Sequence, residues 1–328
     1  MPVGAAPEAE RTILLTGATG FVGSAVRPAL QAAGWHVRGL TRDAARAARH
    51  APGLDWVEGD VGDRDAMASA LEGAQAALYL VHGIREGAGY HEREVAAAAG
   101  FSAAAAEAGV QRIVYLGGVA PTGPGTEHLR SRVEVGETLR AGSVPTIELR
   151  ASMIVGHGSL SWLIVRDLAA RLPVMILPRW LRSRTEPVAI DDVIVALVRA
   201  LDLPIEANAW FDVPGPEVLS GKEFLDRTAV LMGLGAPLSI DVPFLSPRLS
   251  SLWIRMVTRA DWSVAREVVI GLTEDLLARD DDFWSRIDHP QRLDFDEAAR
   301  RALAAERGSR PARGFWGLVE RVRGVGSG

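Results

Sequence analysis

Three glycines near the start of the chain have a spacing suited to phosphate binding. Gly17, Gly20 and Gly23 form the pattern G-x-x-G-x-x-G. Glycine has no Cβ atom, so backbone N–H groups in such a turn can approach a phosphate closely. If a helix follows the turn, its first N–H groups and its dipole also favour negative charge. The trio alone can also be an ordinary loop, so its meaning depends on the neighbouring elements.

The elements on either side of the glycines favour a dinucleotide site. Ile13–Thr16 predicts a short buried strand before the turn, and an apolar pattern of helical spacing runs from Val22 to Leu30 after it. In this strand–turn–helix order the glycines bind the pyrophosphate of a dinucleotide. We therefore expect the whole turn to contact a cofactor, including Thr19, Phe21 and Val22.

Strands and helices alternate along the first half of the chain. Further strands are predicted at Trp35–Leu40, Ala76–Val81, Ile113–Leu116 and Thr146–Leu149, of which Ala76–Val81 is a continuous apolar run and therefore a buried strand. The alanine-rich stretch Tyr90–Ala108 predicts a helix between two of them. This alternation predicts an α/β fold, a Rossmann-type doubly wound parallel sheet with helices on both faces.

The alternation loosens after Arg150, which suggests a second, smaller unit. We expect residues 1–155 and 186–214 to form the dinucleotide-binding domain, and residues 156–185 and 215–328 to form a substrate-binding lobe. Within the first of these, Trp210–Val213 predicts a strand that returns to the main sheet. Asp191 and Asp192 are expected to cap the helix that follows them.

Composition excludes several classes of protein. The chain has 328 residues and a formal net charge of -5, which gives no support for a nucleic-acid partner. It has no cysteine, so disulfides, thiolate catalysis and thiolate metal sites are excluded. We find no persuasive metal-ligand spacing, no signal peptide and no apolar stretch long enough for a transmembrane segment. We therefore expect a cytoplasmic protein without a metal.

Three segments resemble the extended and atypical short-chain dehydrogenases/reductases, and most of all their NmrA-like, NAD(P)-binding bacterial branch. They are TGATGFVG at Thr16–Gly23, RIVYLGGV at Arg112–Val119, and HLRSRVEVGETLR with ELRASMIVGHGS between His128 and Ser159. A fainter likeness extends through PVAIDDV and PRLSSLW. The resemblance implies a Rossmann domain that binds NAD(P), with a small substrate-covering domain built from the C-terminal part and an insertion.

The end of the second predicted strand favours NADP(H) over NAD. A site for NAD usually places an acidic side chain there to accept from the ribose 2′-OH. Here the chain reads Gly39-Leu40-Thr41-Arg42, with no carboxylate before Asp43. A guanidinium pairs with a 2′-phosphate through two parallel hydrogen bonds, so we predict NADP(H) with Arg42 as its ligand. Arg38 is a less favoured ligand, and a solvated Arg42 is the alternative.

Four further positions are candidates for cofactor contact. Asp60 and Val61 resemble the family's pair beside the adenine, although Asp60 is equally suited to forming a turn. Leu80 and His82 lie where a buried strand ends, at the carboxyl edge of the sheet where ligands bind. His82 either hydrogen-bonds the cofactor or only begins the following loop.

The usual catalytic residues of the family are replaced in this sequence. The short-chain dehydrogenases use a serine or threonine together with tyrosine and lysine spaced Y-x-x-x-K. The resemblance places His128 at the tyrosine position and Arg132 at the lysine position, one helical turn apart. Where a serine would polarise the carbonyl, the strand ends at Gly118. Arg132 is expected to hold the ribose hydroxyls of the cofactor.

Two interpretations of His128 remain open. Imidazole titrates near neutral pH, so His128 can donate a proton in place of tyrosine. Alternatively His128 only begins a helix and packs against the cofactor, and the protein binds NADP(H) without this chemistry.

The leading functional hypothesis is an NADPH-dependent oxidoreductase that reduces a small apolar or aromatic carbonyl, enone or quinone-like compound. The alternatives are a non-catalytic NADP(H)-binding sensor of the NmrA-like kind, and an NAD(P)-dependent epimerase or isomerase. We expect a small-molecule substrate and allow for a homodimer. The arginine-rich tail, residues 307–328, is expected to be solvated, with a membrane surface or a partner as the alternative contact.

Overall fold

A computed structural model describes most of the chain outside a few segments. The described residues are 11–82, 90–121, 123, 126–171, 174–177, 182–204, 207–235, 238–241 and 274–306, with only the backbone described for 174–177 and 238–241. The arginine-rich tail at residues 307–328 lies outside them.

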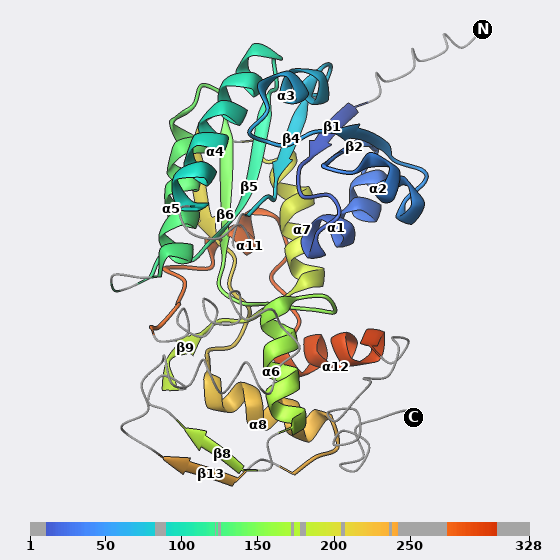
Figure 1. Cartoon of the computed structure of the whole chain (residues 1–328). Helices are drawn as coiled ribbons and strands as arrows, with labels where there is room; N and C mark the ends of the chain where they lie inside the picture. The colour runs from blue at the N-terminus through green and yellow to red at the C-terminus, as the bar shows by residue number, and fades with distance from the viewer. Residues whose placement is uncertain are drawn as a thin grey trace, which may run out of the picture.

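A seven-stranded parallel sheet forms the centre of the larger part of the molecule (Figure 1). Its strands run in the order β11-β6-β5-β4-β1-β2-β3. Their bounds are β1 (Arg11–Leu15), β2 (Trp35–Thr41), β3 (Asp55–Glu58), β4 (Ala76–Tyr79), β5 (Arg112–Gly118), β6 (Thr146–Ala151) and β11 (Ala209–Asp212). The strands predicted in the first half of the chain are confirmed, and β11 returns to pair with β6 as predicted.

Helices cover both faces of the sheet, which confirms the doubly wound α/β fold. Helices α1 (Phe21–Ala32) and α7 (Ile190–Leu201) pack on one face, while α3 (Arg64–Leu71), α4 (Tyr90–Glu107) and α5 (Glu127–Ala141) cover the other. Alternate strand residues enter the two cores, so Ile13 and Leu15 pack with α1 whereas Leu14 packs on the opposite side. A further helix, α2 (Ala44–His50), lies beside β2 and β3.

The chain order reverses between β1 and β4, which are neighbours at the centre of the sheet. In open α/β sheets, ligands bind at the carboxyl ends of the strands at such a switch point. The glycine turn follows β1 and Leu80–His82 follows β4, so the fold brings both to this point.

A second group of elements has a core of its own and lies below the sheet in Figure 1. Its helices are α6 (Leu160–Arg171), α8 (Gly221–Leu231) and α12 (Phe295–Glu306), which pack around Trp162, Phe224 and Phe295. Short strand pairs accompany them: β7 (Ile154–Val155) with β10 (Val188–Ala189), β9 (Arg184–Thr185) with β12 (Leu219–Ser220), and β8 (Val174–Leu177) with β13 (Leu238–Asp241). The short helix α11 (Asp282–Arg286) packs against β11.

The expected aspartate cap of α7 is wrong. Strand β10 runs directly into the helix, so Ala189 occupies the N-cap position without a side-chain bond, and both aspartates fall inside the first turn. Asp192 is 3% exposed and binds the C-terminal segment instead. Its Oδ1 bonds to His289 Nε2 at 2.8 Å, and its Oδ2 accepts from the backbone N–H of Leu293 at 2.9 Å.

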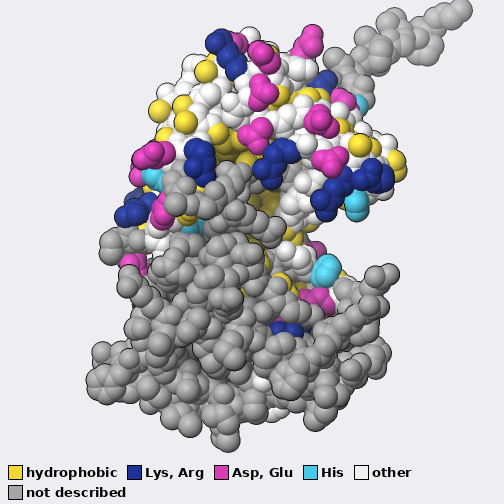
Figure 2. Space-filling model, viewed as in Figure 1, with side chains coloured by type: hydrophobic (Ala, Val, Ile, Leu, Met, Phe, Trp, Pro, Cys, Tyr) yellow, Lys and Arg dark blue, Asp and Glu magenta, His cyan; other side chains and the backbone are white. Residues whose placement is uncertain are grey.

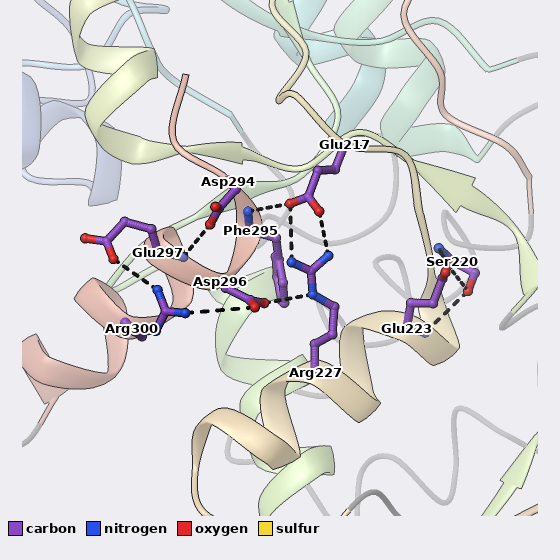
Figure 3. Close-up of polar contacts among 9 residues, drawn as sticks. All are labelled: Glu217, Ser220, Glu223, Arg227, Asp294, Phe295, Asp296, Glu297 and Arg300. Carbon is purple, nitrogen blue, oxygen red and sulfur yellow. Dashed lines mark hydrogen bonds and ion pairs between the residues drawn. The ribbon is translucent and has the colours of Figure 1, made fainter. Parts of the chain in front are cut away.

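One arginine joins three parts of the lower lobe (Figure 3). Arg227 on α8 donates to Glu217 Oε1 at 2.7 Å and to Asp296 Oδ1 on α12, also at 2.7 Å. Glu217 in turn accepts from the backbone N–H of Phe295 at 2.8 Å. The guanidinium thus holds α8, α12 and the segment before β12 in one arrangement.

We expect Arg227→Ala to lower the free energy of unfolding by about 1–2 kcal/mol, because two carboxylates lose their shared donor. The midpoint of urea-induced unfolding measures this. Arg300→Ala is the matched control, since Arg300 contacts Asp296 and Glu297 from an exposed position and its loss should cost under about 0.5 kcal/mol. Equal destabilisation by the two variants would contradict the role given to Arg227.

Candidate functional site

The glycine turn is packed so closely that two of its glycines have no room for a side chain. Gly17 has a φ of 64°, and a Cβ there would lie 2.7 Å from the carbonyl oxygen of Leu80. A Cβ on Gly23 would overlap the carbonyl oxygen of Gly17 and lie 2.9 Å from the Cα of Ala18. The turn, the start of α1 and the end of β4 are therefore in backbone contact.

The first turn of α1 is left open to a ligand. Gly20 is its N-cap and supplies no side-chain bond. The N–H groups of Phe21, Val22 and Gly23 precede the first helical bond, which Ser24 donates to the carbonyl of Gly20 at 2.9 Å. Thr19 and Gly20 are exposed at the tip of the turn. A pyrophosphate fits this arrangement, because unpaired N–H groups and the helix dipole both favour an anion.

Thr16 fixes the end of β4 beside this turn. Its Oγ1 donates to the carbonyl of Leu78 at 3.3 Å and accepts from the backbone N–H of Leu80 at 3.0 Å. Leu80 is itself buried, and both its carbonyl group and its Cβ lie against Gly17 of the turn. The residues expected to contact the cofactor from β1 and from β4 are thus held together.

At the end of β2, Arg42 is the exposed cation that directly follows the strand. Arg38 is engaged elsewhere: it donates to Asp55 Oδ2 at 2.8 Å and to the carbonyls of Ala70 and Glu72 at 3.0 and 2.7 Å. Asp43 caps α2 by accepting from the backbone N–H of Arg46 at 2.8 Å. Arg38, the less favoured 2′-phosphate ligand, is thus held within the domain, and the assignment of Arg42 to the 2′-phosphate stays a prediction.

Asp60 and Val61 lie after β3. Asp60 is exposed, and its Oδ1 accepts from the backbone N–H of Gly62 at 3.0 Å, so the turn that the sequence allowed is present. Val61 is buried in the core beside Met67. Contact of this pair with an adenine stays a prediction. Because Asp60 Oδ1 already accepts from Gly62, Asp60 Oδ2 would accept from the adenine amine, and the buried Val61 would contribute its backbone.

His128 and Arg132 are hydrogen-bonded partners at the start of α5. Thr126 caps this helix by accepting from the backbone N–H of Leu129 at 3.2 Å. One turn later, Arg132 Nε donates to His128 Nε2 at 3.1 Å. The i, i+4 spacing puts both side chains on one helical face, as the sequence predicted.

Strand β5 packs against Arg132 of this pair. A Cβ on Gly118 would lie 3.0 Å from Arg132 Cδ, so the missing side chain lets Arg132 lie against the strand end. Tyr115 is buried on the same strand, and its hydroxyl group donates a hydrogen bond to the backbone carbonyl of Arg132 at 3.0 Å. Gly118, His128 and Arg132 are thus brought together, in agreement with their predicted grouping.

The structure also brings His82 to this cluster, which the sequence analysis had treated separately. Its ring lies 6.1 Å from that of Tyr115, measured between centroids. Burial, followed by the proximity of Arg132 and then of His128, lowers the pKa of His82 well below its usual value, while a hydrogen bond to the backbone of Leu116 opposes this. His82 therefore faces the same guanidinium as His128.

Both imidazoles of this cluster are neutral at neutral pH. Burial and then the charge of Arg132 lower the pKa of His128 to about 3. Burial also lowers the pKa of Arg132, and Tyr115 and Glu94 oppose that change. The site consequently contains one guanidinium that is hydrogen-bonded to the uncharged His128 and lies within electrostatic reach of the uncharged His82.

A buried ion cluster behind α5 was missed by the sequence analysis. Glu148 on β6 is 0% exposed and accepts from Arg140 Nε and from Arg150 Nε, each at 2.8 Å. Its carboxylate occupies the place that a side chain on Gly136 of α5 would fill. The available local signal was a glutamate within the predicted strand Thr146–Leu149, because a carboxylate in a buried strand is almost always paired.

A second missed feature ties the loop before α5 to the C-terminal part of the chain. The backbone N–H of Gly123 donates to Glu274 Oε2 at 3.0 Å. The next residue, Asp275, bonds to Arg184 Nη2 at 2.8 Å. No local pattern predicts such contacts, because the partners are remote in the sequence.

Other site classes find no support in the part of the chain that the structure describes. Among these residues no group of three or more His, Asp or Glu side chains is placed to hold a metal ion. None of the described helices combines the length and the apolar character needed to cross a membrane. On the face shown in Figure 2, acidic and basic side chains are intermixed over the sheet domain.

Comparison with solved structures shows the same fold. Triphenylmethane reductase of Citrobacter sp. superposes with a TM-score of 0.71 at 17% identity, covering 89% of this chain and 99% of that one. The same enzyme complexed with NADP(H) gives a TM-score of 0.70. WbmH of Bordetella bronchiseptica, in complex with NAD+, gives 0.67 at 16% identity, covering 91% of this chain and 99% of its own.

Comparison of sequences supplies the family. A relative in Streptomyces griseus subsp. griseus, (4-alkanoyl-5-oxo-2,5-dihydrofuran-3-yl)methyl phosphate reductase, is 32% identical over 240 residues, covering 70% of this chain and 76% of its own. Ceramide reductase of Caulobacter vibrioides is 28% identical over 207 residues, covering 61% and 64%. Residues 9–156 match the model of the NmrA-like family. The chain therefore belongs to the NmrA-like family of the short-chain dehydrogenases/reductases.

Proposed function

We propose that this protein is a nicotinamide-dependent oxidoreductase that uses NADP(H) to reduce a small apolar or aromatic carbonyl, enone or quinone-like compound. The observation that carries the proposal is the open first turn of α1 at the switch point of the sheet, with the His128–Arg132 pair at a neighbouring strand end. The first feature suits a dinucleotide phosphate, and the second suits a polar group of a substrate or ribose.

Residues at several places support binding of NADP(H). The N–H groups at the start of α1 would hold the pyrophosphate, and Arg42 would hold the 2′-phosphate. Asp60 would accept from the adenine amine, while Gly118, His128 and Arg132 would lie at the nicotinamide end. When bound, the cofactor supplies a hydride, and the protein contributes binding, orientation and electrostatics.

The relatives support reduction without fixing the substrate. Both sequence relatives are named as reductases, one of a phosphorylated dihydrofuranone and one of ceramide. The triphenylmethane reductase structure contains NADP(H). These names differ in substrate, so the substrate class rests on the residues of this chain. A cytoplasmic location, a small-molecule substrate and a homodimer remain predictions.

A non-catalytic NADP(H) sensor is the second candidate, because a glycine and a histidine stand where the family has its serine and tyrosine. Spectroscopic assays of NADPH oxidation against a panel of quinones, enones and aldehydes separate the two. An oxidoreductase consumes NADPH in proportion to the substrate reduced. Tight NADPH binding with no consumption on any substrate would favour the sensor.

Arg42 is expected to determine the choice of dinucleotide. We predict that the wild-type protein binds NADPH at least about tenfold more tightly than NADH, and that Arg42→Ala removes most of this difference by losing a charge-assisted pair with the 2′-phosphate. Isothermal titration with each dinucleotide measures it. Arg46→Ala on the neighbouring exposed helix α2 is the control and should preserve the preference. Equal wild-type affinities for NADPH and NADH would contradict the assignment.

A further inference from the structure

The hydrogen bond between Arg132 and His128 fixes where the imidazole proton lies. An arginine guanidinium has only donors, so the 3.1 Å contact from Arg132 Nε requires a lone pair on His128 Nε2. A neutral imidazole carries one proton, which must then be on Nδ1. His128 therefore offers an N–H donor on the ring edge away from Arg132.

The surroundings of His128 keep this state over a wide pH range. Among the described residues, Arg132 on α5 is the charged group that acts on His128, and His82 after β4 belongs to the same cluster. Tyr115 of β5, and Glu94 and Tyr90 of α4, act on Arg132 in turn. Arg132 disfavours a second positive charge, and burial disfavours any charge on the ring. Tyr115 commits its own proton to the carbonyl of Arg132.

We propose that His128 is a neutral hydrogen-bond donor to the carbonyl oxygen of the substrate, that Arg132 is the positioning residue that fixes its tautomer, and that the substrate is a conjugated carbonyl compound. This rests on the proposed function and narrows it. It also replaces the interpretation of His128 as a proton donor, because a neutral imidazole N–H stabilises an oxyanion without acting as an acid near neutral pH.

The substrate class follows from the charge that forms during reduction. An isolated ketone becomes a localised alkoxide, which needs a proton as it forms. A conjugated acceptor instead gains hydride at its β-carbon from the dinucleotide, which is oxidised. The π electrons of the C=C bond then form a double bond between the α-carbon and the carbonyl carbon. The π electrons of the C=O bond move onto the oxygen atom that faces Nδ1 of His128. Water then protonates the α-carbon of this delocalised enolate, which gives the saturated carbonyl compound.

The tautomer is measurable in the protein without any ligand. Long-range ¹⁵N–¹H correlation spectra of histidine-labelled protein distinguish the two tautomers, and His128→Gln identifies the signal among the seven histidines. We expect the Nδ1–H form of His128, unchanged between about pH 5 and pH 8. An Nε2–H form, or a titration near the ordinary imidazole pKa of about 6.5, would overturn the proposal.

Arg132→Met tests the positioning role, with Arg130→Met as control on an exposed position of the same helix. Loss of the Nε donor and its charge should raise the pKa of His128 and release the tautomer, while Arg130→Met should leave both unchanged. Identical spectra for the two variants would overturn the role of Arg132. If Arg132→Met does not fold, the wild-type spectrum still decides the tautomer.

Product analysis tests the substrate class separately. With NADPH deuterated at the transferred position and a cyclic enone, we expect deuterium at the β-carbon and an intact carbonyl. An allylic alcohol with deuterium at the carbonyl carbon would overturn the assignment to conjugated reduction. Absence of any reduction across enones and ketones would overturn the proposed function together with the substrate class, whereas the tautomer result stands by itself.

Discussion

Replacement of Gly23 by alanine is expected to weaken NADPH binding by about 100-fold. The added methyl group would overlap the carbonyl oxygen of Gly17 and approach the Cα of Ala18 to 2.9 Å, so the turn must separate from α1. Overpacking of this kind costs about 1–3 kcal/mol, and displacement of the N–H groups removes contacts to the pyrophosphate as well. Isothermal titration with NADPH measures the loss of affinity.

Gly100→Ala is the matched control for Gly23→Ala. Gly100 lies on an exposed face of α4, and a Cβ there meets no atom within 4 Å. Its replacement should leave the NADPH affinity unchanged and stabilise the helix by about 0.5–1 kcal/mol. Wild-type affinity in folded Gly23→Ala protein would show that the dinucleotide does not use this turn.

The largest expected effect on stability comes from Glu148→Ala, which should lower the free energy of unfolding by about 3–5 kcal/mol. Glu148 is fully buried, and its removal leaves the guanidinium groups of Arg140 and Arg150 without their shared carboxylate. The loss is large because a buried charge without a partner costs more than the pair gains. Urea-induced unfolding followed by circular dichroism measures it.

Two controls separate the charge from other effects of that substitution. Glu148→Gln keeps the shape and one acceptor oxygen, so its cost should be clearly smaller than that of alanine. Glu297→Ala removes an exposed partner of Arg300 and Arg301 and should leave the free energy of unfolding nearly unchanged, because solvent screens this ion pair. A loss below about 1 kcal/mol for Glu148→Ala would contradict a tightly buried cluster.

The sheet was predictable because its strands are buried on both faces and are therefore almost continuously apolar. Ala76–Val81 and Ile113–Leu116 show this, whereas Thr146–Leu149 alternates polar and apolar residues. Helix α2 was missed because Ala44–His50 has little apolar periodicity: only Ala47 is buried. The aspartate cap of α7 was predicted wrongly because β10 joins the helix directly, which no local pattern in Asp191–Val193 reveals.

The features of the candidate site likewise divide into those that local sequence predicts and those that depend on tertiary structure. The glycine turn was predictable because all its residues lie next to one another in the sequence. The pairing of His128 with Arg132 was predictable for the same reason, because the two residues are one helical turn apart. The approach of His82 to that pair depends on the neighbouring positions of β4 and β5 in the sheet. The bond from Gly123 to Glu274 depends on the path of the distant C-terminal segment. Contacts of this kind follow from tertiary structure alone.

A crystal structure of the protein with NADP+ tests the central claim most directly. The account predicts the pyrophosphate at the N–H groups of Phe21, Val22 and Gly23, the 2′-phosphate at Arg42, and the nicotinamide ring beside Gly118 and His128. A dinucleotide bound away from the first turn of α1, or a nicotinamide ring remote from His128, would contradict it.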